Sequence, residues 1–459
     1  MASVVATGIP ARAATRTQSL GFVIAASSGG TLIEWYDFFL YGVLATFFAS
    51  HFFPGDMKNG FLYALGIFWT GFVVRPLGAV VFGYLGDLVG RKYCFMLTLG
   101  MMGLSTFLVG CLPTYDAVGW LAPALLILCR VVQGLALGGQ YGGAATFIAE
   151  HAPDGQRGYY TSWLQMTATM GIVMALLVIM AFRLGMGDQA FGDYGWRFPF
   201  MLSALLVLLS AYLRLKLGES PLFQRLKEMG KASASPMRDA YGNKRNWALI
   251  ALALFGFAAP SSVVWYTSQF YALAYMQTVL MVPYVTVYLV MIGALTLGVP
   301  FFLLWGWLSD RIGRRVIMTA GYVLAIVSYW PVFTLMGEVK DSALLLGVLV
   351  WYMMFLVTLV YAPLAAFLIE LFPARIRYSS LSLPYHIGTG VFGGGVPFIA
   401  TYLATTFSGV PLIGLAYPIG VAAIGVVVST LGLKRETHHV RIWDEVAVGS
   451  EHDPILDSA

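Results

Sequence analysis

Two stretches of the chain, 223 residues apart, decide the fold. The first reads GYLGDLVGRK over residues 83–92, and the second reads GWLSDRIGRR over residues 306–315. Gly, Asp, Gly, Arg and a second basic residue recur at the same positions in both, and each stretch follows an apolar run of helix length. A motif repeated in this way indicates an internal duplication, and parallel repeats of six helices are the architecture of a rocking transporter.

A second set of matching residues supports the duplication. An acidic residue, a proline and an arginine recur after an offset of 220 residues. They are Glu150, Pro153 and Arg157 in the first half and Glu370, Pro373 and Arg377 in the second. The repeat therefore extends along most of both halves.

The composition places the chain in a membrane. Of the 459 residues, 59% are hydrophobic and only 11% are charged, and the mean hydropathy is +0.78. A soluble domain carries roughly 25% charged residues. The net charge of +5 comes from short connectors and forms no basic patch with interleaved aromatic residues, so we expect no nucleic-acid partner.

Apolar runs bounded by charge, proline and glycine give twelve candidate membrane spans. They cover residues 20–49, 60–82, 94–112, 119–150, 159–182, 197–217, 247–276, 283–308, 316–336, 343–370, 379–407 and 411–433. Only helices and closed barrels satisfy the backbone in lipid, and these runs lack strand alternation. The predicted class is an all-α polytopic membrane protein with twelve transmembrane helices in two six-helix pseudo-repeats.

A basic segment between spans six and seven separates the two halves. We expect an N-terminal segment, a first six-helix bundle, a central loop, a second bundle and a C-terminal tail, over residues 1–19, 20–217, 218–246, 247–433 and 434–459. Lys and Arg concentrate in alternate connectors, which by the positive-inside rule places both termini and the central loop in the cytoplasm.

The repeated loop resembles the signature between the second and third helices of the major facilitator superfamily. Residues 30–42, GTLIEWYDFFLYG, together with RPLG at residues 75–78, resemble the metabolite:proton symporter family. Members of that family carry proline and betaine, 2-oxoglutarate, citrate and shikimate. The resemblance implies the major facilitator fold and proton-coupled uptake of a small organic acid or zwitterion by alternating access. The second copy departs from the signature at Ser309, where the first has Gly86.

Four charged residues lie well inside predicted spans: Glu34, Asp37, Arg75 and Arg130. A charge at the centre of a membrane helix costs about 2.5 kcal/mol or more, so each suggests a function. Glu34 and Asp37 are one helical turn apart and share a face with Tyr41. Two carboxylates so close in a poorly polar medium do not both stay ionised, so one of them can carry a proton. The alternative is a permanent structural ion-pair cluster among all four.

Arg130 lies one turn from Gln133, and this pattern resembles the superfamily's motif in helix four. The resemblance implies that Arg130 faces the central cavity and helps to couple the proton to the substrate. We therefore predict a proton-coupling set formed by Glu34, Asp37 and Arg130. The alternative is that Gln133 only holds Arg130 for helix packing.

The predicted substrate site combines the arginines with polar and aromatic residues of both halves. Its members are Tyr41, Arg75, Arg130, Gln133, Trp265, Gln269, Tyr361, Tyr385 and His386. Two intramembrane arginines favour a carboxylate substrate. A lone histidine within the membrane is more often structural than functional, so His386 is the weakest member of this set.

Carboxylates and bases at the cytoplasmic helix ends predict a gate that closes in the outward-facing state. Its members are Asp87, Arg91, Glu150, Arg157, Asp310, Arg314, Glu370 and Arg377. The alternative is that some of these bases only set the topology.

Three other function classes remain to be compared. A proton-independent facilitator or exchanger would be indifferent to a proton gradient, and a non-transporting sensor would show no flux. An enzyme is disfavoured because the chain carries no His-Glu-x-x-His, Gly-x-Ser-x-Gly or ATP-binding motif. Three cysteines, Cys94, Cys111 and Cys129, offer no zinc spacing. We expect no metal and no cofactor beyond the coupling proton, and a monomer in a bacterial inner membrane.

Overall fold

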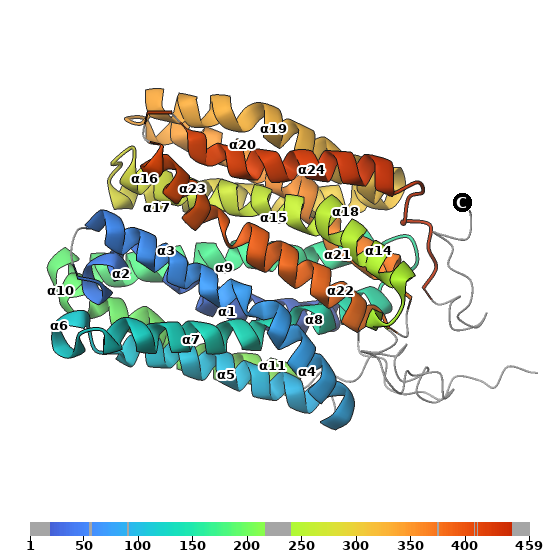
Figure 1. Ribbon diagram of the computed structural model, residues 1–459. Helices are drawn as coiled ribbons and strands as arrows, with labels where there is room; N and C mark the ends of the chain where they lie inside the picture. Colours follow the sequence, from blue (N-terminus) through green and yellow to red (C-terminus); the bar gives the residue numbers. More distant parts are fainter. Residues whose placement is uncertain are drawn as a thin grey trace, which may run out of the picture.

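The computed structural model describes residues 19–54, 57–89, 91–215, 240–373, 376–407, 409–410 and 412–442, and these residues form helices and connectors without a strand. Two bundles of long helices lie side by side in Figure 1, the first coloured blue to green and the second yellow to red. The predicted all-α fold is confirmed.

The first bundle runs from α1 to α11. Its elements are α1 (Leu20–Val43), α2 (Ala45–Phe52), α3 (Met57–Val73), α4 (Arg75–Val89), α5 (Arg91–Cys111), α6 (Tyr115–Val118), α7 (Leu121–Gly138), α8 (Tyr141–His151), α9 (Arg157–Met186), α10 (Asp188–Asp193), η1 (Gly195–Arg197) and α11 (Phe198–Leu215).

The second bundle runs from α14 to α24. Its elements are α14 (Lys244–Ala253), η2 (Leu254–Ala258), α15 (Ala259–Tyr266), η3 (Thr267–Tyr271), α16 (Ala272–Thr278), α17 (Tyr284–Gly298), α18 (Pro300–Ile312), α19 (Arg314–Glu338), α20 (Ala343–Tyr361), α21 (Leu364–Leu371), α22 (Arg377–Ile387), η4 (Gly388–Gly393), α23 (Val396–Thr406), η5 (Ile413–Leu415) and α24 (Ala416–Gly432).

Ten helices in the described part of the chain are long and apolar enough to cross a membrane, and several join two of these elements. The first predicted span, 20–49, is not straight, because α1 and α2 meet at an angle of 57°. The third, 94–112, corresponds to a shorter apolar helix over Met96–Cys111. The seventh begins at Lys244, within the predicted central loop, whose residues 218–239 lie outside the described part.

Helix breaks recur at matching places in the two halves. The break between α3 and α4 falls just before Pro76, and its counterpart between α17 and α18 falls at Pro300. Proline lacks the backbone donor that a continuous helix needs, so a break at these points is expected. Arg75 is the first residue after the first break and therefore projects from an interrupted helix.

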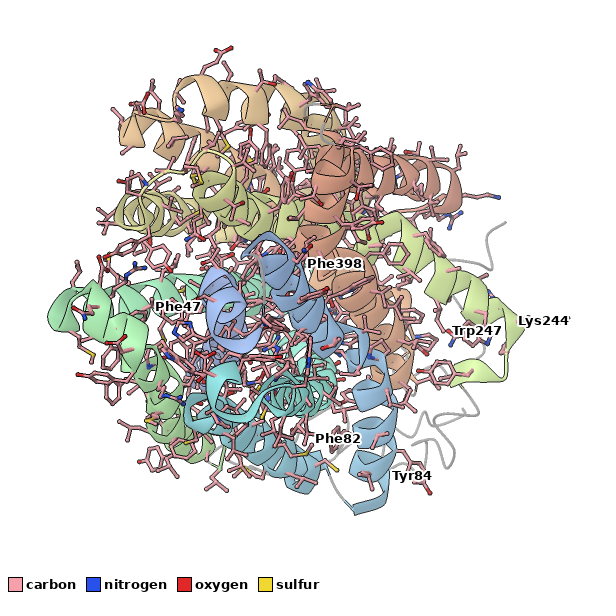
Figure 2. The ribbon with its side chains drawn as sticks, turned by 60° about the vertical axis from the view of Figure 1, so that its left-hand side comes forward. Phe47, Phe82, Tyr84, Lys244, Trp247 and Phe398 are labelled. Atoms are coloured by element: carbon pink, nitrogen blue, oxygen red, sulfur yellow. The ribbon has the colours of Figure 1, made fainter. Side chains whose placement is uncertain are left out.

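The two halves meet along α9, which packs against α17, α18 and α21, and along α4 and α8, which pack against α22. The end of the bundle at which the chain leaves α24 is called here the tail end, and the end with α2, α10 and α16 the far end (Figure 1). In Figure 2, Phe82 and Tyr84 on α4, and Lys244 and Trp247 on α14, mark the tail end of each half.

Candidate functional site

Arg75 lies in the middle of the molecule, fully buried at the seam between the halves. Its guanidinium carbon is 5.5 Å from the ring centre of Trp35, 5.6 Å from that of Phe72 and 5.9 Å from that of Tyr385. No guanidinium nitrogen has a hydrogen-bond partner among the described residues. An arginine keeps its charge at any ordinary pH, so this cation lies among aromatic rings with no carboxylate paired to it among the described residues.

Close helix packing fixes the position of Arg75. A Cβ atom placed on Gly138 of α7 would overlap the backbone oxygen of Arg75, so only glycine allows the two helices to approach this closely. Gly134 and Gly138 lie one helical turn apart on α7, a spacing typical of closely packed membrane helices. Its consequence is that the helix break carrying Arg75 rests directly against α7.

The two carboxylates of α1 have different surroundings. Gln140, with its amide nitrogen facing Glu34, donates to both carboxylate oxygens at 2.8 and 3.1 Å. Asp37 is equally buried, but neither of its oxygens has a hydrogen-bond partner among the described residues. Burying an unpaired carboxylate anion is strongly unfavourable, so this environment suits the protonated form of Asp37.

Arg130 is held by neutral groups. One nitrogen donates to the backbone oxygen of Phe38 at 3.1 Å and to Gln133 at 2.7 Å. The guanidinium also lies 4.2 Å from the ring centre of Phe38 and 4.9 Å from that of Tyr41. The hydroxyl of Tyr41 donates to the backbone oxygen of Ala64 at 3.0 Å. Tyr41 therefore contacts Arg130 through its ring, while its hydroxyl is bound to the backbone of α3.

Three tyrosines next to Arg75, namely Tyr141, Tyr361 and Tyr385, join the two halves. Tyr141 stacks on Tyr385 with ring centres 3.6 Å apart and an angle of 2° between the planes. Tyr361 and Tyr385 share a hydrogen bond of 2.8 Å between their hydroxyls. Gln165 accepts from Tyr141 at 2.6 Å and donates to the backbone oxygen of Tyr361 at 2.8 Å. Tyr361 and Tyr385 were predicted site residues, whereas Tyr141 and Gln165 were not.

Three predicted site residues of the second half carry polar atoms that have no hydrogen-bond partner among the described residues. These atoms are the two ring nitrogens of His386, the indole nitrogen of Trp265 and the amide oxygen of Gln269. The amide nitrogen of Gln269 donates across the seam to Thr169 at 3.1 Å. Gln269 lies in the π-helical turn η3, and such turns are frequent at functional sites.

Nearly all buried polar side chains in native proteins have a partner, so several unpartnered ones among the predicted site residues require an explanation. Among the described residues this set contains donors on Arg75, Arg130 and Trp265, donor or acceptor atoms on His386, and acceptors on Asp37 and Gln269. A bound polar ligand that accepts from Arg75 would satisfy part of this set. The structure thus places Arg75 of the first half beside Tyr385 of the second, so predicted residues from both halves lie together.

A carboxylate crosses the seam at the tail end. The two oxygens of Asp310 accept hydrogen bonds from the backbone nitrogens of Gly158 and Tyr159, at 2.8 and 2.9 Å. These nitrogens belong to the first turn of α9, where an anion is favoured. Asp310 of the second half therefore caps a helix of the first half, and close contact of Gly158 with Gly306 accompanies it.

The remaining tail-end charges form a buried network around Arg314. This guanidinium pairs with Glu370 at 2.9 Å and with Asp310 at 2.7 Å. Arg157 of the first half lies 3.9 Å from Glu370, and Arg377 of the second lies 4.0 Å from Glu150. This set, with Asp310, is called here the tail-end latch. The predicted gate residues Asp87 and Arg91 have side chains outside the described part of the structure.

The segment that follows α24 packs into the same network. The Thr437 hydroxyl donates to Glu370 at 2.9 Å, and Arg157 donates to the backbone oxygen of Val440 at 2.6 Å. Glu436 accepts from the backbone nitrogen of Arg315 at 3.2 Å. Thr437 is fully buried, so this part of the tail belongs to the packed end of the molecule.

A second latch closes the far end and was not predicted. Arg183 donates to Asp188 at 2.6 Å, and Tyr284 of the second half donates to the same carboxylate oxygen at 2.9 Å. The Arg183 guanidinium also lies 3.2 Å from the centre of the Tyr284 ring. These two donors hold the pKa of Asp188 below its ordinary value. Because both latches are formed and the central residues are buried, the structure is an occluded state.

Comparisons with known proteins agree with this geometry. Residues 22–248 match the family model "Sugar (and other) transporter". The chain is 33% identical over 386 residues to the α-ketoglutarate permease of Escherichia coli (strain K12), covering 83% of this chain and 87% of the relative. It is 32% identical over 396 residues to the citrate-proton symporter of Salmonella typhi, covering 85% and 89%. It is 33% identical over 414 residues to the proline/betaine transporter of Escherichia coli (strain K12), covering 88% and 81%.

Solved structures show the same fold. The crystal structure of a D-xylose-proton symporter superimposes with a TM-score of 0.67 and 17% identity, over 92% of this chain and 99% of that chain. A partially occluded inward-open conformation of the xylose transporter from Escherichia coli gives a TM-score of 0.69 and 16% identity, over 91% and 98%. The sequence relatives, the repeat and the two-bundle architecture together lead to one conclusion: the chain belongs to the major facilitator superfamily, in its metabolite:proton symporter family.

Proposed function

We propose that this transporter takes up a small organic carboxylate together with a proton across a bacterial inner membrane, with its tail end in the cytoplasm. The observation that carries the proposal is Arg75, a fully buried guanidinium with three unpartnered nitrogens at the seam of the two halves. A carboxylate is the ligand that best matches such a planar donor. The relatives named for α-ketoglutarate, citrate and proline/betaine all have substrates that contain this group.

The proton is assigned to Asp37. Among the described residues, neither of its two oxygens makes a hydrogen bond of ordinary length, while Glu34 accepts two bonds from Gln140. A carboxylate that accepts two hydrogen bonds is stabilised as the anion, and one without any is stabilised by protonation. In the occluded state Glu34 is therefore the fixed charge, and Asp37 is the group that gains and loses a proton.

The substrate would lie between the halves. Arg75 supplies the donors for a carboxylate, and Trp265, Gln269 and His386 of the second half supply further polar atoms. The stacked pair Tyr141 and Tyr385 closes the path toward the tail end. Alternating access then requires the tail-end latch to open while the far-end latch stays closed, and the reverse.

The test is uptake into proteoliposomes of a labelled panel of mono-, di- and tricarboxylates, shikimate, proline and betaine, with and without an inward proton gradient. We expect one carboxylate to accumulate, and the accumulation to collapse with an uncoupler. Equilibration that ignores the gradient would show a facilitator instead. Absence of flux for every compound would favour a sensor of the same fold.

Variants separate the roles of the two carboxylates. Asp37→Asn is expected to lose gradient-driven accumulation but to keep substrate exchange, because an amide mimics the protonated acid. Glu34→Gln keeps Asp37 as the titrating group, so its residual uptake is expected to remain responsive to the gradient, although the added positive charge of the interior should lower the rate. Arg75→Lys is expected to lose substrate binding, because an ammonium cannot present the planar pair of donors. If Glu34→Gln uncouples transport and Asp37→Asn does not, the assignment of the proton is wrong.

A further inference from the structure

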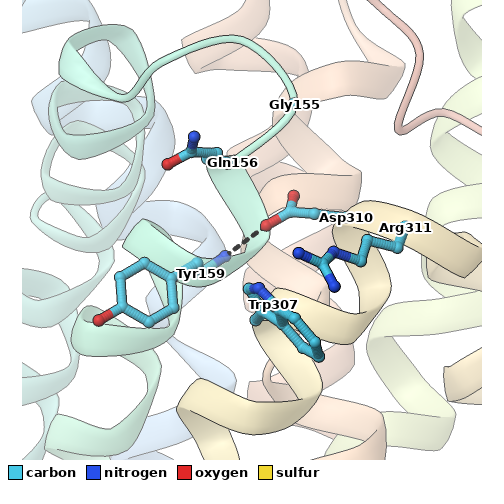
Figure 3. Close-up of a pocket in the computed structure, with 6 residues that line it drawn as sticks. All are labelled: Gly155, Gln156, Tyr159, Trp307, Asp310 and Arg311. Atoms are coloured by element: carbon cyan, nitrogen blue, oxygen red, sulfur yellow. Dashed lines mark hydrogen bonds between the residues drawn. The ribbon is translucent and has the colours of Figure 1, made fainter.

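A cavity of about 370 Å³ lies at the tail end of the seam, away from the central site. Both halves line it, as Figure 3 shows. Its lining residues are Gly155, Gln156 and Tyr159 of the first half and Trp307, Asp310 and Arg311 of the second. A space of this size is sufficient for a small polar group.

Arg311 is a cation in the lining of this cavity, and none of the described carboxylates pairs with it. The carboxylate of Asp310 is already occupied, because it accepts from the nitrogens of Gly158 and Tyr159 and pairs with Arg314. The guanidinium of Arg311 lies 3.7 Å from the ring centre of Trp307. Arg311 has no carboxylate partner among the residues that the structure describes. The free cation at the rim therefore favours an anion.

The surface below the cavity is apolar. Leu304, Trp307 and Arg311 follow one another along one face of α18, at intervals of three and four residues. Leu304 and Trp307 are exposed although they belong to a span that crosses the membrane. Tryptophan is enriched where the hydrocarbon region meets the headgroups. Along this face an apolar side chain (Leu304), an interfacial ring (Trp307) and a cation (Arg311) follow in that order. This order matches the acyl chain and anionic headgroup of a lipid.

We propose that this cavity binds the phosphate of an anionic glycerophospholipid from the cytoplasmic leaflet, with an acyl chain along Leu304 and Trp307. The choice of leaflet rests on the proposed orientation. The order of apolar and basic groups on α18 favours a lipid over a free phosphate ion, which would use only Arg311. Gln156 and Tyr159 complete the site from the other half.

A lipid held in this way changes the transport cycle. The cavity exists only where the two halves meet at the tail end, so a ligand that touches both halves stabilises the state in which the tail-end latch is closed. Opening toward the cytoplasm separates Tyr159 from Arg311. The anionic lipid should therefore slow inward opening and favour the occluded or outward-facing states.

The test uses the purified full chain and native mass spectrometry with phosphatidylglycerol, phosphatidylcholine or inorganic phosphate. Arg311→Gln is compared with Arg435→Gln, which removes an exposed cation at the same end of the molecule. We expect Arg311→Gln to weaken phosphatidylglycerol binding about fivefold, which corresponds to about 1 kcal/mol for one basic side chain at an anionic surface. Arg435→Gln should bind as the wild type does.

Three results would overturn the proposal. If the two variants lose phosphatidylglycerol equally, or neither loses it, Arg311 is not the phosphate ligand. If inorganic phosphate binds as tightly as phosphatidylglycerol and displaces it, the site takes a free anion and the lipid assignment is wrong. Equal binding of phosphatidylcholine by the wild type would also refute it, because the net negative charge would have no role. None of these results bears on uptake, so the proposed function stands or falls separately.

Discussion

Removal of the Asp310 carboxylate should unbalance the transport cycle toward the state that is open at the tail end. In the occluded structure this group accepts two hydrogen bonds from the first turn of α9, at 2.8 and 2.9 Å, across the seam. A hydrogen bond to a charged group contributes about 1.5 kcal/mol at the low end of measured values. Both bonds must break when the halves separate, so the closed state loses about 3 kcal/mol in Asp310→Ala.

This free energy corresponds to a shift of roughly 150-fold in the ratio of closed to open tail ends. Asp310→Asn keeps a neutral acceptor and should lose about half of the free energy, or roughly tenfold in the same ratio. A larger shift in Asp310→Ala than in Asp310→Asn would show that Asp310 acts through its hydrogen bonds to α9 and not through the volume of its side chain. Arg314 keeps Glu370 as its partner in both variants, so the protein should still fold.

The assay is the distance between spin labels on the two halves, measured in liposomes by double electron–electron resonance. Tyr84 on α4 and Lys244 on α14 are exposed positions at the tail end, and both point outward in Figure 2. The exposed Cys111 is replaced first so that only the introduced cysteines react. Asp341→Ala, which removes an exposed carboxylate at the far end, is the matched control. Distances in Asp310→Ala that equal those of the control would refute the reasoning.

Two further perturbations test the latches separately. Gly158→Val should hold the tail end open and reduce uptake, because a Cβ atom at this position overlaps the backbone of the other half. The control is Gly185→Val on the same helix, where a Cβ atom meets nothing within 4 Å. Equal uptake by the two variants would contradict the close packing at Gly158. The far-end latch should be insensitive to external pH between about 5 and 8. The pKa of Asp188 is depressed, so its carboxylate stabilises the latch at any pH above the ordinary pKa of an aspartate. This stabilisation is lost only as the pH falls through the lower pKa that Asp188 has in the folded protein. Asp188→Asn should widen the distance between labels at Tyr194 and Val279 at every pH, and a wild-type distance that changes over that range would show that another group controls this end.

Much of the fold could be predicted because the membrane imposes simple rules. Long apolar runs must be helices, and the repeated stretch at residues 83–92 and 306–315 revealed the duplication. What sequence could not show is where helices break and bend. The 57° angle between α1 and α2 occurs within one continuous apolar run. Hydropathy measures transfer into lipid and contains no information on helix direction.

The central site was predictable in composition but not in pairing. Charges inside spans identified Asp37, Arg75 and Arg130, because each is costly to bury. The four charged residues were equally compatible with one ion-pair cluster. In the structure, Arg75 and Arg130 are held by aromatic rings and neutral oxygens instead. Aromatic residues are so frequent in this chain that their sequence positions could not show which ones face a guanidinium.

Neutral polar residues were the main omission. Gln140, Tyr141 and Gln165 determine which carboxylate is satisfied and how the halves join, yet none carries a charge that would mark it within a span. The far-end latch was missed for a different reason. Arg183 and Asp188 lie in a predicted connector of the first half, and Tyr284, which contacts both, lies about a hundred residues away in the second half. Such long-range pairs depend on the docking of the two halves.

The buried charges explain how proton and substrate could be coupled. Between the two latches the described residues place two arginines and two carboxylates in the membrane, with a sum of zero when Asp37 is ionised. A proton alone makes this region positive, and a monocarboxylate alone makes it negative. Both together restore zero, as does the empty carrier with Asp37 ionised. On the proposed mechanism, the surroundings of Asp37 in this structure, which suit the protonated acid, correspond to the doubly loaded carrier.

An occluded state must keep this region out of water, and an uncompensated buried charge is costly by several kcal/mol. The two latches can therefore close together only on the empty or the doubly loaded carrier. On the proposed mechanism, coupling needs no direct contact between Asp37 and the substrate. It follows from the shared requirement that the sealed interior be neutral. Arg75 has no hydrogen bond of ordinary length among the described residues, so it makes that neutrality depend on the substrate's carboxylate.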